Sequence, residues 1–530
     1  MHFPVNPWAA AAAFPVLTAM TLVPLAAMAA VFCTRTLPAA FRFGFAGACL
    51  NVLLSVYLLL VFDAEESGLH LVEQMHFAGL SYAVGVDGVN ILFIPLTAVI
   101  AFLVMYYIFS HSQKRYHGRT FVACVLGYEA ILIGAFASLN VMQFWLWSAL
   151  ELIPVIYLTL HCGTGLHRRW AVDRFLQYWG SALLMTLAGF LLLGFGLIDS
   201  EHPLTFDWLT IKRNNAYLHD EALIFVLLFY GFAVRMPLFP FHGWLPILAE
   251  QGTVASCAIF LAGLKLGIFA VLRFILPLLP GVAEDWSGLV LTLALISIFY
   301  GAVMALLQIN IRRLLAFAVI SQTGILVIGL FCFNDFGLEG SIMLSIAYGL
   351  ATAGMLFSVG LIYERTGTAV MPRLGGLFDS NLTLGMLFLI SALSTLVKPG
   401  TPGFDATHLI IEGTVEEHGW LLAIAILTGN LLAAAFILWA FQRIFLATSR
   451  RFAQPYSSLH HPVLKERLIT LVICTLLIGT GFYMRPWLRL VDQDAALITK
   501  GYPIHSSMPH DHPAGISGSD NVQFEEEQQP

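Results

Sequence analysis

Apolar residues occupy this chain in long, nearly unbroken runs, separated by short polar segments. Roughly 20 consecutive apolar residues cross the hydrocarbon core of a bilayer, and by this measure the sequence contains about fourteen spans. Backbone groups cannot stay unpaired in lipid, so each span is predicted to be helical. The predicted spans cover approximately residues 8–32, 43–62, 88–109, 120–138, 142–161, 176–198, 222–248, 253–278, 288–308, 314–332, 341–363, 383–413, 421–445 and 468–486.

The loops between these spans alternate in charge. One set carries arginine and lysine: Arg35, Arg42, Lys114, Arg115, Arg119, Arg168, Arg169, Arg174, Arg312, Arg313, Arg365, Arg373, Arg450, Arg451 and Lys465. The other set carries carboxylates: Asp63, Glu65, Glu66, Glu73, Asp199, Glu201, Asp207, Asp220, Glu221, Glu284, Asp285, Asp335, Glu339, Glu416 and Glu417. Because Lys and Arg favour the cytoplasmic side, we expect a multi-pass protein of a bacterial inner membrane with both termini on the periplasmic side.

Composition supports a membrane protein and argues against other classes. The chain is 58% hydrophobic and 11% charged, whereas soluble domains average about 25% charged residues. The net charge of -6 and the lack of a basic patch give no indication of nucleic-acid binding. The seven cysteines are scattered, which indicates neither a metal site nor disulfides. The polar tail from about Tyr502 is predicted to be disordered, with His505, His510 and His512 as exposed residues rather than metal ligands.

Ionisable residues inside the predicted spans are the candidate chemistry. Each costs about 2.5–3.5 kcal/mol to insert at mid-membrane, so such residues usually face a bundle interior or a water-filled path. Acids and bases together in a medium of low dielectric constant have coupled pKa values, as proton hopping requires. The sequence therefore predicts a path for protons, or alternatively for sodium, within the bundle. The candidates are Glu129, Glu151, Arg235, Lys265, Lys398 and Asp405.

Each candidate also has a purely structural interpretation. Glu151 and Arg235 could form an ion pair that only holds helices together, and Glu129 could lie near a surface. Lys265 could extend to the interface, although about a dozen apolar residues flank it on each side. Arg273 lies nearer a helix end, and for this residue we expect the interfacial position.

Two spans are interrupted by prolines, which free backbone carbonyls and are tolerated where a helix lines a polar cavity. The seventh span contains Pro237 and Pro240, and the twelfth contains Pro399 and Pro402. The breaks lie five spans apart, and a cation precedes the first proline of each. This spacing predicts two inverted five-helix repeats, spans 4–8 and 9–13.

The predicted organisation has five parts. Three N-terminal spans occupy 1–119, the two repeats occupy 120–278 and 288–445, a loop and last helix occupy 446–500, and the tail occupies 501–530.

Four segments carry recognisable patterns: Gly85–Asn90, Phe144–Tyr157, the stretch from Arg235 to Pro246, and Gln308–Gly324. Together they resemble the antiporter-like, proton-translocating membrane subunits of respiratory complex I, most closely the M type; this superfamily also includes Mrp antiporter subunits. Gly85–Asn90 is similar to the GxDGxS/N motif at the start of the third helix, and Phe144–Tyr157 to the fifth helix with its glutamate. The stretch from Arg235 through His242 and Trp244 to Pro246 resembles the KxPxxPxHxWLP signature of the broken seventh helix. Gln308–Gly324 resembles the segment leading into the tenth helix.

The resemblance implies roles for single residues. Glu151 matches the fifth-helix glutamate that pairs with the seventh-helix lysine, Lys265 matches the eighth-helix lysine that links two half-channels, and Glu129 matches a fourth-helix glutamate. The family lysine is here Arg235, and the family histidines are here Gln322 and Tyr348. Arginine essentially keeps its proton, and glutamine does not titrate. The resemblance therefore implies altered or reduced pumping, with the exit charge moved to Lys398 or Asp405.

Three functions fit these observations. The first is a proton-translocating subunit of an NADH-quinone oxidoreductase-type assembly, in contact with other membrane-arm subunits and carrying no cofactor or redox centre of its own. The second is the ion-conducting subunit of a cation/proton antiporter or of an inorganic-carbon uptake complex. The third is a membrane-arm subunit that no longer conducts.

Overall fold

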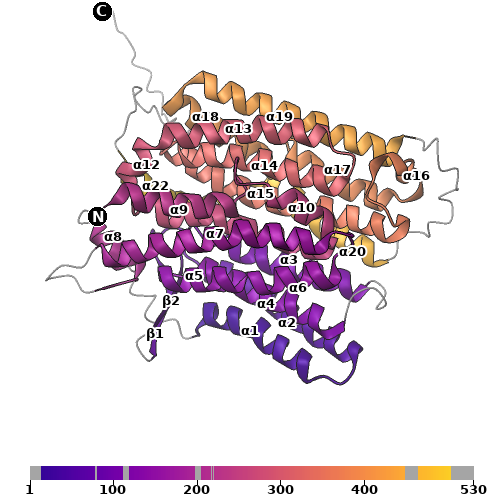
Figure 1. Ribbon diagram of the computed structural model, residues 1–530, viewed down its shortest axis with the longest axis horizontal. Coiled ribbons are helices and arrows are strands. Elements are labelled where there is room, and N and C mark those ends of the chain that lie inside the picture. Colours follow the sequence, from indigo (N-terminus) through magenta and orange to yellow (C-terminus); the bar gives the residue numbers. More distant parts are fainter. Residues whose placement is uncertain are drawn as a thin grey trace, which may run out of the picture.

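The computed structural model describes residues 14–77, 80–110, 118–196, 204–215, 218, 220–447 and 464–502. Its helices run side by side in one bundle, with the first half of the chain on one side and most of the second half on the other (Figure 1). The predicted tail histidines and the loop with Arg450 and Arg451 lie outside the described residues.

Long helices make up most of the first half. They are α1 (Val16–Cys33), α2 (Leu37–Val61), α3 (Phe93–Ser110), α4 (Gly118–Ala137), α5 (Val141–Leu150), α6 (Leu152–Cys162), α7 (Arg168–Phe195), α9 (Glu221–Arg235), α10 (Trp244–Gln251) and α11 (Val254–Ala270). A π-helix, η3 (Val271–Ile275), continues α11, and two short helices, α8 (Trp208–Arg213) and α12 (Pro280–Asp285), lie between longer ones.

The second half also consists mainly of long helices. It contains α13 (Ser287–Leu306), α14 (Ile311–Leu330), α15 (Asp335–Thr366), η4 (Met371–Arg373), α16 (Leu377–Ser380), α17 (Leu382–Thr395), α18 (Pro402–His418), α19 (Trp420–Phe441), the π-helix η5 (Gln442–Leu446), α20 (Leu464–Phe482), α21 (Arg485–Arg489) and α22 (Asp492–Thr499). Both α11 and α19 therefore run directly into a π-helix that contains one arginine, Arg273 or Arg443.

Within the described ranges, nine helices are long and apolar enough to cross a membrane. The fold is a polytopic helical membrane protein, as predicted. The count of fourteen spans and the inverted repeats stay predictions, because the proline-broken spans are divided into shorter helices. Helices α14 and α15 are buried over 94% of their apolar windows, but α1 and α2 over only 33%, which places the former at the centre and the latter at the rim.

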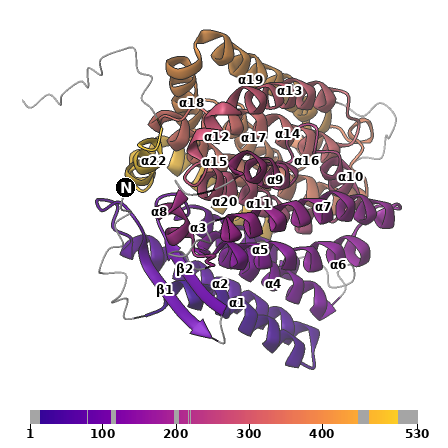
Figure 2. The same cartoon turned by 60° about the vertical axis from the view of Figure 1, so that its left-hand side comes forward.

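A β-hairpin was not predicted from the sequence. Strands β1 (His70–Phe77) and β2 (Leu80–Val86) pair antiparallel within the segment that we interpreted as an acidic loop (Figure 2). The Glu73 carboxylate accepts hydrogen bonds from the backbone N–H groups of Leu17 and Thr18 at 2.8 and 2.9 Å, so the hairpin is tied to the first turn of α1.

Loops of like charge gather at opposite ends of the bundle. At one end, which we call the arginine-loop face, Arg312 donates to Thr164 Oγ1 at 2.7 Å and Gly165 N–H donates to the Gln251 carbonyl at 3.1 Å. At the other end, the acidic-loop face, Asp494 of α22 accepts from Gly68 N–H at 2.8 Å. The α11–η3 helix runs from the first face to the second.

Candidate functional site

A buried ion pair joins two interrupted helices. Glu151 lies at the junction of α5 and α6, just before Pro154, and Arg235 is the last residue of α9, just before Pro237. The guanidinium of Arg235 donates to Glu151 Oε2, and these residues are 5% and 0% exposed. The guanidinium carbon of Arg235 also lies 4.9 Å from the centroid of the Trp179 ring, a cation–π contact. The predicted pairing of Glu151 with Arg235 is thus present in the structure.

Tyr128 of α4 completes this pair, and sequence reasoning missed it. Its hydroxyl donates to Glu151 Oε1 at 2.5 Å. A Cβ on Gly263 of α11 would lie 2.2 Å from the Tyr128 hydroxyl and 2.5 Å from Glu151 Oε1, so only glycine allows this approach. The glutamate is therefore held by two donors and packs directly on the helix that carries Lys265.

Glu129, the residue after Tyr128 in α4, contacts a different helix. The Asn51 side chain of α2 donates to Glu129 Oε1 at 2.6 Å, and the carboxyl group is fully buried. Glu129 Oε2 has no hydrogen-bond partner among the described residues. Asn51 was also missed, although a lone asparagine in the middle of an apolar span is a signal of buried polar pairing.

Lys265 extends from α11 towards the second half of the bundle. It is 8% exposed, and its Cε lies 3.6 Å from the position that a Cβ would take on Gly349 of α15. The adjacent Tyr348 lies towards Thr407 of α18. Both hydroxyls are buried, and neither makes an ordinary hydrogen bond within the described part of the chain. Buried Gln322 of α14 likewise has an unpaired amide nitrogen there.

The two candidates in the twelfth predicted span do not join this group. Lys398 follows the end of α17 with an exposed side chain, and Asp405 is half-buried in the first turn of α18. The sequence analysis placed Lys398 on a path within the bundle, and its exposed side chain does not match that prediction. Lys398 lies in the turn between α17 and α18, where Val397 and Gly400 both have positive φ angles.

The proline breaks are present at both predicted places. Between α9 and α10 the chain passes through Pro237 and Pro240, and the Trp244 indole N–H donates to the freed Val234 carbonyl at 3.1 Å. His242 is buried in this break, with an unpaired Nδ1 among the described residues, and Pro246 lies in the first turn of α10. In the second break Pro399 lies in the turn and Pro402 begins α18.

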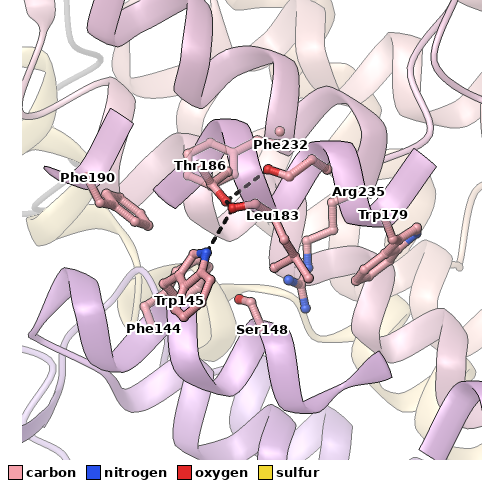
Figure 3. A pocket seen from close by; sticks show the side chains of 11 residues that line it. Phe144, Trp145, Ser148, Trp179, Leu183, Thr186, Phe190, Phe232 and Arg235 are labelled. Atoms are coloured by element: carbon pink, nitrogen blue, oxygen red, sulfur yellow. Dashed lines mark hydrogen bonds between the residues drawn. The ribbon is translucent and has the colours of Figure 1, made fainter. Parts of the chain in front are cut away.

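A small cavity adjoins the ion pair (Figure 3). Its volume is about 20 Å³, enough for about one water molecule, and it lies between α5, α7 and α9. Ser148 Oγ and Arg235 Nε are buried beside it and have no protein partner among the described residues. Buried polar groups are normally hydrogen-bonded, so these two atoms make the cavity suited to hold water.

A second charge cluster lies at the acidic-loop face and was not predicted. Arg273 of η3 binds both carboxylate oxygens of Asp87 at 2.5 and 2.8 Å, and Asp494 accepts from Gly88 N–H at 2.5 Å. Burial, reinforced by the Asp87 carboxylate, raises the pKa of Asp494 to about 7. Burial, reinforced by Arg273, lowers the pKa of Lys212 in α8 to about 7. Arg273, expected at an interface by itself, is instead a buried ion-pair partner.

Buried ion pairs, an enclosed lysine and two broken helices within a polytopic bundle define the class of ion-translocating membrane subunits. The sequence matches the family described as "NADH:quinone oxidoreductase/Mrp antiporter, TM" over residues 138–433. The chain belongs to this family.

Relatives and solved structures agree with that assignment. NADH-quinone oxidoreductase subunit M of Rhodobacter capsulatus is 30% identical over 485 residues, covering 87% of this chain and 92% of the relative. F(420)H(2) dehydrogenase subunit M of Methanosarcina mazei is 29% identical over 438 residues, covering 81% and 87%.

Among solved structures, respiratory complex I from Thermus thermophilus contains a chain with a TM-score of 0.79 and 28% identity, covering 92% of this chain and all of that one. A chain of the Mrp complex from Dietzia sp. has a TM-score of 0.81 at 17% identity, covering 92% and 98%, which shows a shared fold.

Proposed function

We propose that this chain is a proton-translocating membrane subunit of an NADH-quinone oxidoreductase-type assembly, which couples redox energy to proton transport. The observation that carries the proposal is the enclosed Glu151–Arg235 pair beside the helix of Lys265. Charges in a bilayer that are paired and hidden from lipid are characteristic of ion pathways. The family membership supports the same function.

Roles within the path follow from chemistry. Arg235 keeps its proton, so it acts as a fixed positive charge that keeps Glu151 ionised. Lys265 has no such constraint, and a buried lysine can lose its proton, so it is the proton carrier of the first half. Tyr128 positions Glu151. Glu129 provides a further carboxylate on the α2 side.

From Lys265 the path continues into the second half. Tyr348, Thr407 and Gln322 carry buried polar atoms without partners in the described residues, and such groups bind internal water. Water held by these groups substitutes for the histidines of the family. Lys398 and Asp405 remain the candidates for the exit of this path, and the side chain of Lys398 is exposed.

The surroundings follow from the same proposal. The partners are other membrane-arm subunits and the lipid bilayer, the membrane is the bacterial inner membrane, and the arginine-loop face is cytoplasmic. Both termini then lie on the periplasmic side. The two five-helix repeats and the five-part division of the chain belong to this proposal. The paired breaks and the π-helices η3 and η5, which end α11 and α19, support them.

Redox-driven proton uptake into proteoliposomes tests the proposal. We expect Lys265→Ala to reduce uptake to less than about a tenth, because the path then lacks its first-half carrier. Phe357→Ala, a buried residue of α15 outside the polar layer, is the matched control and should keep most of the uptake. Unchanged uptake in Lys265→Ala would remove Lys265 from the path.

A second function is favoured by one observation. Gln322 and Tyr348 stand where the family has histidines, which suits exchange of a cation against protons as in an antiporter subunit, or a subunit that serves inorganic-carbon uptake. Sodium dependence of proton uptake in the same vesicles distinguishes these functions, since a pure proton pump gives none.

A further inference from the structure

The segment from Arg485 to Tyr502, which we call the C-terminal strap, lies across the acidic-loop face. It contains α21 and α22, and α22 lies at the same end of the bundle as α8 (Figures 1 and 2). Asp494 of the strap is buried, and its two carboxylate oxygens accept from Gly68 N–H at 2.8 Å and from Gly88 N–H at 2.5 Å. These bonds fix the strap to the turns that precede β1 and α3.

The strap packs directly on the turn that contains Gly88. A Cβ on Gly88 would lie 2.5 Å from the Leu490 carbonyl oxygen and 3.0 Å from Asp494 Oδ2, so a side chain there would push the strap away. The preceding residue, Asp87, is buried and binds both terminal nitrogens of Arg273 at 2.5 and 2.8 Å. Two buried carboxyl groups, those of Asp87 and Asp494, therefore meet at one turn.

The cations near these two carboxyl groups are placed differently. Arg273 uses both terminal nitrogens for Asp87, whereas Asp494 is held by backbone N–H groups, which carry only partial charges. The guanidinium carbon of Arg273 and the Nζ atom of Lys212 lie 5.0 and 5.2 Å from the centroid of the Trp208 ring. We call Asp87, Asp494, Arg273 and Lys212 the acidic-face cluster.

Two members of the acidic-face cluster titrate near neutral pH. Burial, reinforced by the Asp87 carboxylate, gives Asp494 a pKa of about 7, and burial, reinforced by Arg273, gives Lys212 a pKa of about 7. A proton on Asp494 removes the like charge beside Asp87 and the cost of burying a second carboxylate. The docking of the strap is therefore linked to proton binding.

We propose that the acidic-face cluster is a proton-binding site, and that a proton on Asp494 fastens the C-terminal strap to the Gly88 turn. Arg273 comes eight residues after Lys265 in the continuous helix of α11 and η3, about 12 Å farther along its axis. The cluster is thus separate from the site of Lys265. This proton site needs no transport through the bundle, so it goes beyond the proposed function.

The sign of the pH effect follows from the raised pKa of Asp494. As the pH rises from about 4 to about 7, the released strap loses its Asp494 proton first, so the fastened strap loses stability relative to it. Acid medium at the acidic-loop face therefore tightens the strap. The strap also holds the chain just after η3, because the Tyr502 hydroxyl donates to the Leu276 carbonyl at 2.8 Å. Protons on this side thereby fasten the end of the helix that carries Lys265.

Other charged groups around the strap face Asp492 rather than Asp494. Asp492 is half-buried in the first turn of α22 and lies near Arg489 of α21 and Asp335 of α15. Glu339 of α15 lies near Asp492 and Asp335. Asp492 is thus an acidic residue of the same helix turn with a different set of neighbours, which makes it the matched control for Asp494.

Hydrogen–deuterium exchange of the strap peptides tests the proton site. The full-length chain in its assembly is placed in lipid nanodiscs, and exchange at about pH 5 and about pH 7 is corrected for the intrinsic amide rate. We expect opening of the wild-type strap to increase roughly tenfold or more over this range. Asp494→Asn should show little increase. Lys212→Met should move the increase to higher pH, because loss of a cation strengthens proton binding by Asp494.

Asp492→Asn should keep the wild-type pH dependence. The proposal is overturned if wild-type strap opening is equal at both pH values, if Asp494→Asn keeps the full increase, if Asp492→Asn loses it as completely, or if Lys212→Met moves it to lower pH. The wild type and Lys212→Met decide the matter even if Asp494→Asn does not fold. Exchange requires no redox substrate, so its failure leaves the proposed function standing, and a lack of redox-driven proton uptake leaves the proton site standing.

Discussion

The Glu151–Arg235 pair can be tested with a double-mutant cycle. Removing one partner of a buried pair leaves an uncompensated charge, which costs about 3–5 kcal/mol. Arg235→Met leaves the Glu151 carboxylate with only the Tyr128 hydroxyl as donor, so we expect the full cost. Glu151→Gln should cost about 1–2 kcal/mol less, because the Trp179 ring still stabilises the guanidinium at 4.9 Å.

The double variant Glu151→Gln with Arg235→Met removes both charges. We expect its loss in the free energy of unfolding to be smaller than the sum of the two single losses by about 2 kcal/mol or more. The free energy of unfolding is measured by titrating the purified chain with SDS in mixed micelles. Phe357→Ala with Glu151→Gln provides a pair of distant residues that should be additive. Additive losses for the Glu151 and Arg235 variants would refute the pair as described.

Three further predictions concern other parts of the molecule. Tyr128→Phe should destabilise the chain by about 1–3 kcal/mol in the same titration, because the hydroxyl donates to a buried charge, and no loss would place Tyr128 outside the site. The raised pKa of Asp494 makes stability fall as pH rises from about 4 to about 7. Asp494→Asn should therefore make the free energy of unfolding less dependent on pH across that range, and an unchanged pH dependence would contradict this. The lowered pKa of Lys212 makes stability rise between about pH 7 and 10.5. Lys212→Met should therefore reduce this rise in the free energy of unfolding, and an unchanged rise would show that another group causes it.

The helical membrane fold could be predicted from the sequence because apolar run length is a strong signal. The broken helices were equally accessible, since Pro237, Pro240 and Pro402 leave no donor for a helix ladder. The β-hairpin could not be predicted, because residues 70–86 mix charged and apolar residues. Among the described residues its two strands pair with each other, and β1 contacts α1.

Of the site, the charged residues were predictable and their partners were not. Glu151 and Arg235 are conspicuous in apolar spans, whereas Tyr128 and Asn51 are ordinary residues until the folded helices bring them to a carboxylate. For Lys398 the error is the opposite: its sequence position fits a mid-membrane charge, but its side chain is exposed in a turn between two helices. The Asp87–Arg273 pair joins residues that are 186 positions apart, which no local pattern reveals.

The contacts that residues 494–502 make with earlier segments have a consequence for biosynthesis. Asp494 completes the turns at Gly68 and Gly88, the Tyr502 hydroxyl donates to the Leu276 carbonyl at 2.8 Å, and Thr499 donates to Asp335. The ribosome makes Asp494 long after Gly68 and Gly88, whose turns it completes. Maturation of the N-terminal third therefore waits for translation of the C-terminal segment, and a nascent chain halted before residue 485 would expose those turns to quality-control proteases.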